Sequence, residues 1–288
     1  MIINMKLSVT SYSFSQLLRA GKMTQADIPQ AAHELGFDGV EFTDLDGQTY
    51  DEQCRLADTI RKHAEALGIP VVCYAVSANM YQPTKEASDA EVERICRKVD
   101  LAKRLGVPRM RHDMTFALGK SGDAVSFDRM LPVMAENTRR ITEYAAKQGI
   151  VTLTENHGTV SQDSDRIERL YNAVAHENFG LLLDIGNFAC ADEDSFRAVG
   201  RLASYARHVH AKDFAPAVSD GFLTRGGRRI RGTVIGEGMI PIAPCLGALL
   251  HAGYDGYVTV EYEGSEDALA AIARGKANLE ALLKTVGA

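Results

Sequence analysis

The chain has 288 residues, of which 45% are hydrophobic and 24% charged, and its formal net charge is −6. This composition excludes a disordered chain, and the acidic balance provides no basic footprint for nucleic acid. Five scattered cysteines without a C-x-x-C pair exclude a disulfide scaffold. Because no apolar run is long enough to span a membrane and the first residues lack a secretory signal pattern, we expect a cytoplasmic protein without a membrane partner.

Short apolar or β-branched runs recur along the chain, and each is followed by a longer stretch with helical periodicity. The eight predicted strands are Lys6–Ser11, Asp38–Thr43, Pro70–Val76, Pro108–His112, Ile150–Glu155, Gly180–Asp184, Arg207–Lys212 and Tyr257–Tyr262. Strands that alternate with helices pair in parallel, because a parallel connection needs a crossover. Eight such units predict a single (β/α)8 TIM barrel over residues 1–288, with a doubly wound open sheet as the main alternative.

Local signals place the ends of several helices. A glycine in the left-handed conformation commonly ends a helix, which predicts helix ends at Gly36, Gly68, Gly106 and Gly149. Ser88 and Glu91 have the spacing of a capping box, which predicts that a helix begins at Ser88. The only long segment with a weak pattern is 213–241, which follows the seventh strand on the side where barrel loops carry the chemistry.

Four of the last strands end in residues that can ligate a metal. These residues are Glu155, Asp184, His210 and Glu261. Alternation of side chains along each strand allows all four to point into the barrel. A buried carboxylate is costly unless it is paired or bound to a metal. Three carboxylates and one imidazole therefore predict a site for one divalent ion, with Mn²⁺ expected and Mg²⁺, Co²⁺ or Zn²⁺ also compatible.

These strand-end residues and the motifs around them make the chain resemble the xylose-isomerase-like TIM-barrel superfamily, especially its sugar and sugar-phosphate isomerase/epimerase branch. The resemblance rests on Glu155-Asn-His157, Asp184-Ile-Gly-Asn187, His210-Ala-Lys-Asp213, Gly236-Glu-Gly238 and Glu261. It implies that Glu155, Asp184, His210 and Glu261 are the metal ligands, and that Glu155 and Glu261 are also the catalytic acid/base pair. The implied reaction moves a proton next to a sugar carbonyl through a metal-stabilised enediolate.

Three other functions share this scaffold. A metal-dependent dehydratase, such as an inosose-type lyase, would begin with the same proton abstraction and then expel a β-hydroxyl. A non-catalytic sugar-binding barrel is a second alternative. An apurinic endonuclease is disfavoured, because Ile230-Arg-Gly232 stands where that family carries an Asp-x-His ligand pair and because the chain is acidic.

Several further polar residues are candidates for binding a small carbohydrate substrate. They are Glu41, His112, His157, Asn187, Lys212 and Glu237. Ketose epimerases typically carry Arg where His157 stands and His where Asn187 stands, so these departures argue against an ordinary free ketose. The basic cluster at 225–231 leaves an acidic or phosphorylated sugar open. The resemblance also leaves open a homo-oligomer, because barrels of this family often form dimers or tetramers.

Overall fold

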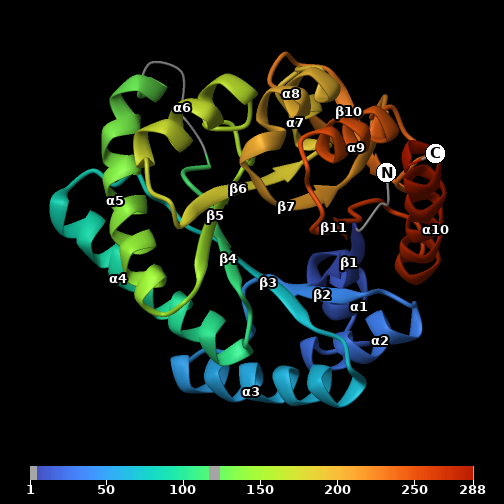
Figure 1. Ribbon diagram of the computed structural model, residues 1–288, viewed down its shortest axis with the longest axis horizontal. Coiled ribbons are helices and arrows are strands. Elements are labelled where there is room, and N and C mark those ends of the chain that lie inside the picture. Colours follow the sequence, from blue (N-terminus) through green and yellow to red (C-terminus); the bar gives the residue numbers. More distant parts are fainter. Residues whose placement is uncertain (1–4, 117–123, 288) are drawn as a thin grey trace.

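The computed structural model describes residues 5–116 and 124–287, which form a closed barrel of parallel strands surrounded by helices (Figure 1). The barrel order is β1-β2-β3-β4-β5-β6-β7-β11, and β11 pairs with β1 to close it. The strands are β1 (Lys6–Thr10), β2 (Gly39–Phe42), β3 (Val71–Val76), β4 (Arg109–His112), β5 (Val151–Glu155), β6 (Phe179–Asp184), β7 (Ala206–Ala211) and β11 (Tyr257–Val260). All eight predicted strands are present, so the prediction of a (β/α)8 barrel is confirmed.

Helices join successive strands and cover the outside of the barrel (Figure 1). They are α1 (Ser15–Arg19), α2 (Ile28–Glu34), α3 (Tyr50–Leu67), α4 (Lys85–Leu105), α5 (Phe127–Lys147), α6 (Ser164–Val174), α7 (Asn187–Cys190), α8 (Ser195–Leu202), α9 (Ile242–His251) and α10 (Ala268–Gly287). Within residues 5–116 and 124–287, no helix combines the length and apolar character needed to cross a bilayer.

The predicted helix ends are confirmed, whereas one predicted helix start is wrong. Gly36, Gly68, Gly106 and Gly149 all adopt positive φ, between 68° and 80°. Helix α4 begins at Lys85, because the Thr84 hydroxyl accepts a hydrogen bond from the Ala87 N–H at 3.2 Å and caps the helix. Ser88 is therefore a buried residue inside the first turn, and the helix starts one turn earlier than its spacing to Glu91 predicted.

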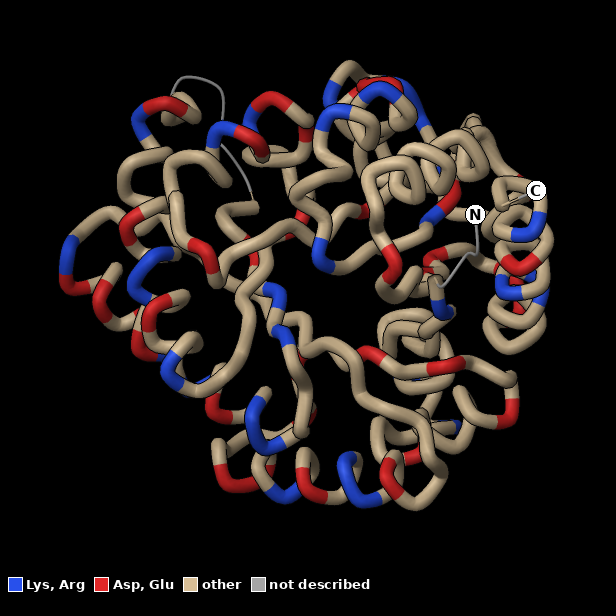
Figure 2. Tube along the Cα trace, viewed as in Figure 1, with Lys and Arg blue, Asp and Glu red and all other residues tan. Residues whose placement is uncertain are grey.

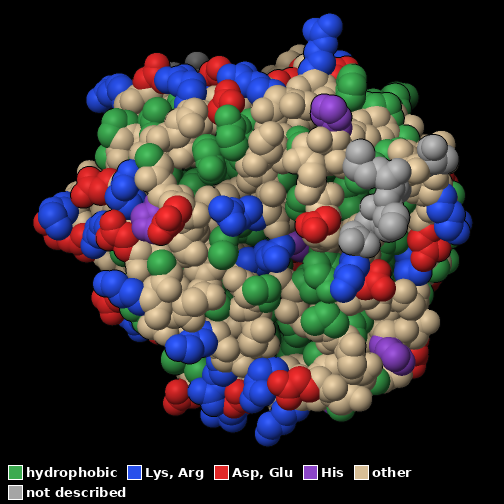
Figure 3. Space-filling view, viewed as in Figure 1, with side chains coloured by type: hydrophobic (Ala, Val, Ile, Leu, Met, Phe, Trp, Pro, Cys, Tyr) green, Lys and Arg blue, Asp and Glu red, His purple; other side chains and the backbone are tan. Residues whose placement is uncertain are grey.

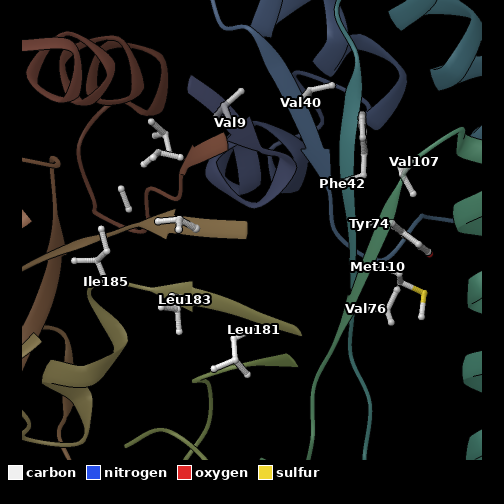
Figure 4. Close-up of a cluster of buried hydrophobic side chains, with 14 of the residues drawn as sticks. Val9, Val40, Phe42, Tyr74, Val76, Val107, Met110, Leu181, Leu183 and Ile185 are labelled. Atoms are coloured by element: carbon white, nitrogen blue, oxygen red, sulfur yellow. The ribbon is translucent and has the colours of Figure 1, made fainter. Parts of the chain in front are cut away.

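The main core lies between the strands and the surrounding helices. Its fully buried members include Val9 of β1, Val40 and Phe42 of β2, and Leu181 and Leu183 of β6, which Figure 4 shows. The side chains that alternate with them point into the barrel.

Inside the barrel, Cys73, Leu153 and Leu182 form a small apolar cluster of their own, against which Val151 packs. The barrel interior is thus apolar at this level. Its polar residues collect toward the carboxyl ends of the strands, where barrel enzymes place their active sites.

Segment 213–241 contains a small antiparallel sheet, which its weak sequence pattern did not predict. The sheet consists of β8 (Asp213–Pro216), β9 (Phe222–Leu223) and β10 (Arg229–Thr233). The Asp213 carboxylate ties the sheet to the following turn by accepting hydrogen bonds from the backbone N–H groups of Gly236 and Gly238, both at 2.9 Å. A Cβ at position 238 would lie only 2.2 Å from Asp213 Oδ1, so glycine is required there.

Charged positions occur on the barrel strands as well as on the outer helices (Figure 2). The face in Figure 3 intersperses basic and acidic side chains, in keeping with 32 basic and 38 acidic residues in the chain. The charges that matter for chemistry are therefore those that the strands carry into the barrel.

The α4 cap provides a test of the fold. Replacing Thr84 with alanine should lower the free energy of unfolding by about 1 kcal/mol, because the cap hydrogen bond to the helix terminus is lost. Ser88→Ala should leave the stability unchanged or slightly higher, because alanine is the better helix former. Urea titration of both variants checks the assignment, and a larger loss for Ser88→Ala would contradict it.

Candidate functional site

The four predicted metal ligands lie together at the carboxyl ends of their strands. Each offers one ligand atom, and the four atoms lie within 4.8 Å of one another. Glu155, Asp184 and His210 belong to β5, β6 and β7, and Glu261 directly follows β11. Asp184 and His210 are also direct neighbours in the pairing of β6 with β7. We call these four residues the ligand cluster.

Two cations neutralise part of the negative charge of the ligand cluster. Arg111 Nη2 lies 2.5 Å from Glu155 Oε2 and 2.7 Å from Asp113 Oδ1. Lys212 Nζ lies 2.8 Å from Glu261 Oε2 and 3.6 Å from Asp184 Oδ2. Because buried carboxylates need a paired charge, these contacts explain how the cluster is tolerated inside the barrel.

Burial and mutual charge shift the protonation equilibria of the cluster. Burial raises the pKa of Asp184 to about 7, against the opposing attraction of the Lys212 ammonium. Burial also acts to raise the pKa of Glu261, but Lys212 and His210 outweigh it and hold that pKa well below its usual value. Desolvation of Lys212 is outweighed in turn by Glu261 and Glu263, which raise the pKa of its ammonium.

The ligand cluster fits a hard divalent cation. It offers three carboxylates and one imidazole, a donor set suited to Mn²⁺ or Mg²⁺. Asp184 Oδ1 accepts hydrogen bonds from the N–H groups of Gly186 and Asn187, at 2.7 and 2.8 Å. Its other oxygen, Oδ2, is buried and receives no hydrogen bond from residues 5–116 or 124–287, so it is free to ligate an ion.

A cavity of about 360 Å³ adjoins the ligand cluster. Its volume lies within the range of small-molecule sites. His157, Asn187, Lys212 and Glu263 provide its polar lining, and the cavity also extends under Phe222 of the small sheet. The predicted substrate contacts His157, Asn187 and Lys212 are therefore brought together.

Two of these lining residues are held by neighbours of the ligand cluster. Asn187 Nδ2 donates to Glu155 Oε1 at 2.9 Å. His157 Nδ1 lies 2.8 Å from Asp113 Oδ1, and this carboxylate raises the pKa of His157 although burial acts to lower it. Each side chain thus reaches the cavity with its orientation set by a buried partner.

Two predicted substrate contacts lie elsewhere. His112 lies two residues after Met110, so its side chain points to the same side of β4, toward the core outside the barrel. Burial lowers the pKa of its imidazole to about 4. On β4 the inward-pointing group is Arg111. The exposed Glu237 carboxylate accepts a hydrogen bond from the Arg274 guanidinium of α10 at 3.0 Å. The Gly-Glu-Gly turn contacts Asp213 through backbone N–H groups and not through this carboxylate.

Glu41 lies next to the ligand cluster and is fully buried. Its carboxylate contacts His210 Nε2 at 2.9 Å and His208 Nε2 at 3.0 Å. Four residues around the ligand cluster were not among the candidate site residues: Asp113, His208, Glu263 and the cation Arg111. The parity that placed Glu155 and His210 inside the barrel would also have found Arg111 once the register of β4 was known.

The basic cluster at 225–231 is largely paired with acidic residues of this chain. Arg225 Nη1 lies 2.6 Å from Asp163 Oδ2, and Arg228 Nε lies 2.6 Å from Asp192 Oδ1. Only Arg225 reaches the cavity, where its Nη2 also donates to the carbonyl oxygen of Thr159 at 3.1 Å. These ion pairs hold the cluster against neighbouring loops, and the acidic or phosphorylated substrate stays a prediction.

Comparison with known proteins identifies the family. The sequence profile described as "Xylose isomerase-like TIM barrel" matches residues 29–283. Inosose dehydratase of Lacticaseibacillus casei is 30% identical over 138 residues, which span 45% of this chain and 46% of that protein. The IOLI protein, solved with a bound zinc atom, superposes with a TM-score of 0.77 at 17% identity, covering 98% of this chain and 99% of that one. This chain belongs to the xylose isomerase-like TIM barrel family.

Proposed function

We propose that the protein is a divalent-metal-dependent dehydratase that acts on a neutral cyclic keto-polyol. The observation that carries the proposal is the buried ligand cluster beside a cavity lined by proton-donating groups. The partial likeness to inosose dehydratases supports the same reaction, although it spans less than half of those relatives. A bound metal would supply Lewis-acid polarisation of the substrate carbonyl.

The residues of this chain can perform both proton transfers of such a reaction. Glu155 or Glu261 would take the proton from the carbon next to the ketone. The electron pair of that C–H bond then forms the new C=C bond as the β-hydroxyl leaves. A second group must protonate the departing oxygen, so that one water is released and the atoms balance.

The cavity offers two groups for this second role. Asp113 raises the pKa of His157, and burial raises the pKa of Glu263. The pKa of Lys212 is raised well above its usual value, so its ammonium is a weak acid whose role is to pair with Glu261. An elimination needs such an acid beside its base, and this requirement favours the dehydratase over a reaction that uses only two carboxylates.

The lining of the cavity indicates a neutral ring. Its cations are engaged by carboxylates, as Lys212 is by Glu261 and Arg225 is by Asp163. Phe116 and Leu223 line the cavity with side chains that are 63% and 58% exposed. A ring with hydroxyls on its edge and C–H groups on its face matches this combination of polar and apolar walls.

An isomerase or epimerase is the second candidate. Glu155 is the last residue of β5, and Glu261 directly follows β11. These two strands are not neighbours in the barrel. An epimerase uses two such carboxylates, one to remove a proton from one face of a carbon and the other to return a proton to the opposite face. This arrangement is what the sequence resemblance implied.

The first prediction of this proposal concerns metal binding. Isothermal titration with Mn²⁺ should show about one ion per chain. Asp184→Asn should weaken binding by more than the roughly 10–100-fold that loss of an outer-sphere partner causes. Glu237→Gln removes a carboxylate that is remote from the ligand cluster and should bind as the native protein does. Absence of Mn²⁺ binding by the native protein would contradict the proposal.

A second prediction concerns pH. The pKa of Asp184 is raised to about 7 in the metal-free protein, so a proton competes with the metal below that pH. The apparent Mn²⁺ affinity should therefore fall as the pH decreases through about 7. It should keep rising above that pH, because Glu41 and Glu261 also raise the pKa of His210. Titrations on both sides of neutrality, in buffers of different ionisation enthalpy, would also reveal the released protons. An affinity independent of pH would contradict this assignment.

A third prediction separates the two reactions. With an inosose and Mn²⁺ in deuterated water, a dehydratase should form a product that has lost one water, as seen by mass spectrometry and NMR. An epimerase would instead form an isomer that carries solvent deuterium. If neither product forms with inososes, ketoses or aldoses, the proposed reaction is wrong.

The same assay tests the roles of the two glutamates. Glu155→Gln and Glu261→Gln should each lower kcat by roughly 100- to 10,000-fold, the usual contribution of an acid/base group. Glu237→Gln is the matched control and should retain its activity. Full turnover in both active-site variants would show that other groups move the proton.

A further inference from the structure

The imidazole of His210 lies between two carboxylates, one at each ring nitrogen. Its Nδ1 lies 3.3 Å from Glu261 Oε2, inside the ligand cluster. Its Nε2 lies 2.9 and 3.0 Å from the two oxygens of Glu41. The side chain is almost completely buried, so no water competes for either nitrogen. A ring held in this way can present only one nitrogen to a metal in the cluster.

Glu41 is itself held by a chain of buried polar groups. His208 Nε2 lies 3.0 Å from Glu41 Oε2 and 2.9 Å from Thr259 Oγ1. The Thr259 hydroxyl in turn lies 2.7 Å from the Ser8 hydroxyl. These residues come from β1, β2, β7 and β11, and each is completely buried. The carboxylate therefore has a defined position across the barrel interior, below the ligand cluster.

The contacts of His208 also define the hydrogen-bond direction. Its Nδ1 is buried without a partner among the described residues, whereas its Nε2 faces the Glu41 carboxylate. An imidazole nitrogen that faces a carboxylate must carry the proton, because two acceptors repel each other. Glu41 thus accepts from Nε2–H of His208 and from Nε2–H of His210. By the same rule, Nδ1 of His210 carries a proton toward Glu261 when no metal is bound, and a metal in the ligand cluster must displace that proton.

We infer that Glu41 is a positioning residue, which accepts the Nε2–H of His210 and leaves the Nδ1 lone pair directed at the metal of the ligand cluster. The inference rests on the proposed function, since it concerns the metal proposed there. A carboxylate behind a ligating histidine fixes the tautomer and the orientation of its ring. Glu41 would then act on the reaction through His210, without contacting substrate.

Glu41, His208 and His210 could also be read as a second metal site, because their ligand atoms lie within 4.8 Å of one another. Hydrogen bonds already join Glu41 Oε2 to Nε2 of both histidines, and His208 Nε2 to Thr259 Oγ1. The trio contains one carboxylate, against three in the ligand cluster. We therefore expect one ion per chain, and a stoichiometry of two would overturn the inference.

The test compares Glu41→Gln with Glu41→Met. Both substitutions remove the negative charge at similar volume, but only the glutamine carbonyl can accept the Nε2–H of His210. Zn²⁺ affinity, measured by titration against a competing chelator, should fall about 10–100-fold in Glu41→Met and clearly less in Glu41→Gln. Equal losses in the two variants would show that only the charge of Glu41 affects Zn²⁺ binding, and would overturn the inference. Unchanged affinity in Glu41→Met would overturn it as well, because positioning of His210 would then have no effect on binding.

A spectroscopic measurement on the native protein decides the question even if Glu41→Met fails to fold. In the Zn²⁺-loaded protein with ¹⁵N-labelled histidine, the His210 ring should carry its proton on Nε2 and bind the metal through Nδ1. The His210→Asn variant identifies the signal by its loss. A proton on Nδ1 would overturn the inference while leaving the proposed metal site intact. Absence of Zn²⁺ binding by the native protein would instead overturn the proposed function, and the inference with it.

Discussion

The structure of the site depends on the cost of placing several carboxylates inside one barrel. Glu155, Asp184 and Glu261 converge within a few ångströms, although a buried carboxylate needs a cation, a proton or hydrogen-bond donors. The chain supplies each of these: Arg111 for Glu155, Lys212 for Glu261, and a raised pKa together with two backbone N–H groups for Asp184. Such partners neutralise the carboxylates only partly, and the remaining charge favours a divalent cation.

Inside the barrel, apolar side chains and hydrogen-bonded polar side chains lie at successive levels below the ligand cluster. Leu153 and Leu182 fill an apolar layer, and the side chain of Glu41 lies with His208 in a hydrogen-bonded layer next to the ligand cluster. Each layer arises from strand alternation, because residues two positions apart on one strand point to the same side. His208 and His210 of β7 follow this rule: one supports Glu41 from below, and the other joins Glu41 to the ligand cluster.

Local patterns were sufficient to predict the eight strands, the glycine-terminated helices and the convergence of the ligand cluster. Each depends on a short-range rule, namely strand alternation, helix capping or a polar residue at a strand end. His112 is not among the residues that line the cavity. Strand β4 has only four residues and carries polar groups on both faces, so alternation alone could not show that Arg111 is its inward-pointing group. Glu237 lies away from the cavity for a different reason. Its turn makes backbone hydrogen bonds to Asp213, and no residue pattern distinguishes such a turn from one that directs a carboxylate at substrate.

Charge pairing also limits what the cavity can bind. A phosphate or carboxylate on the substrate would need a cation, yet Arg225 already serves Asp163 and Lys212 already serves Glu261. Recruiting either cation would leave its carboxylate unpaired, and close to Lys212 this would place further negative charge beside Asp184 and Glu263. Hydroxyl and ketone groups avoid this penalty, since they exchange hydrogen bonds with the carboxylates and amides without displacing an ion pair. The same pairing that makes the buried carboxylates tolerable therefore supports the proposal of a neutral polyol substrate.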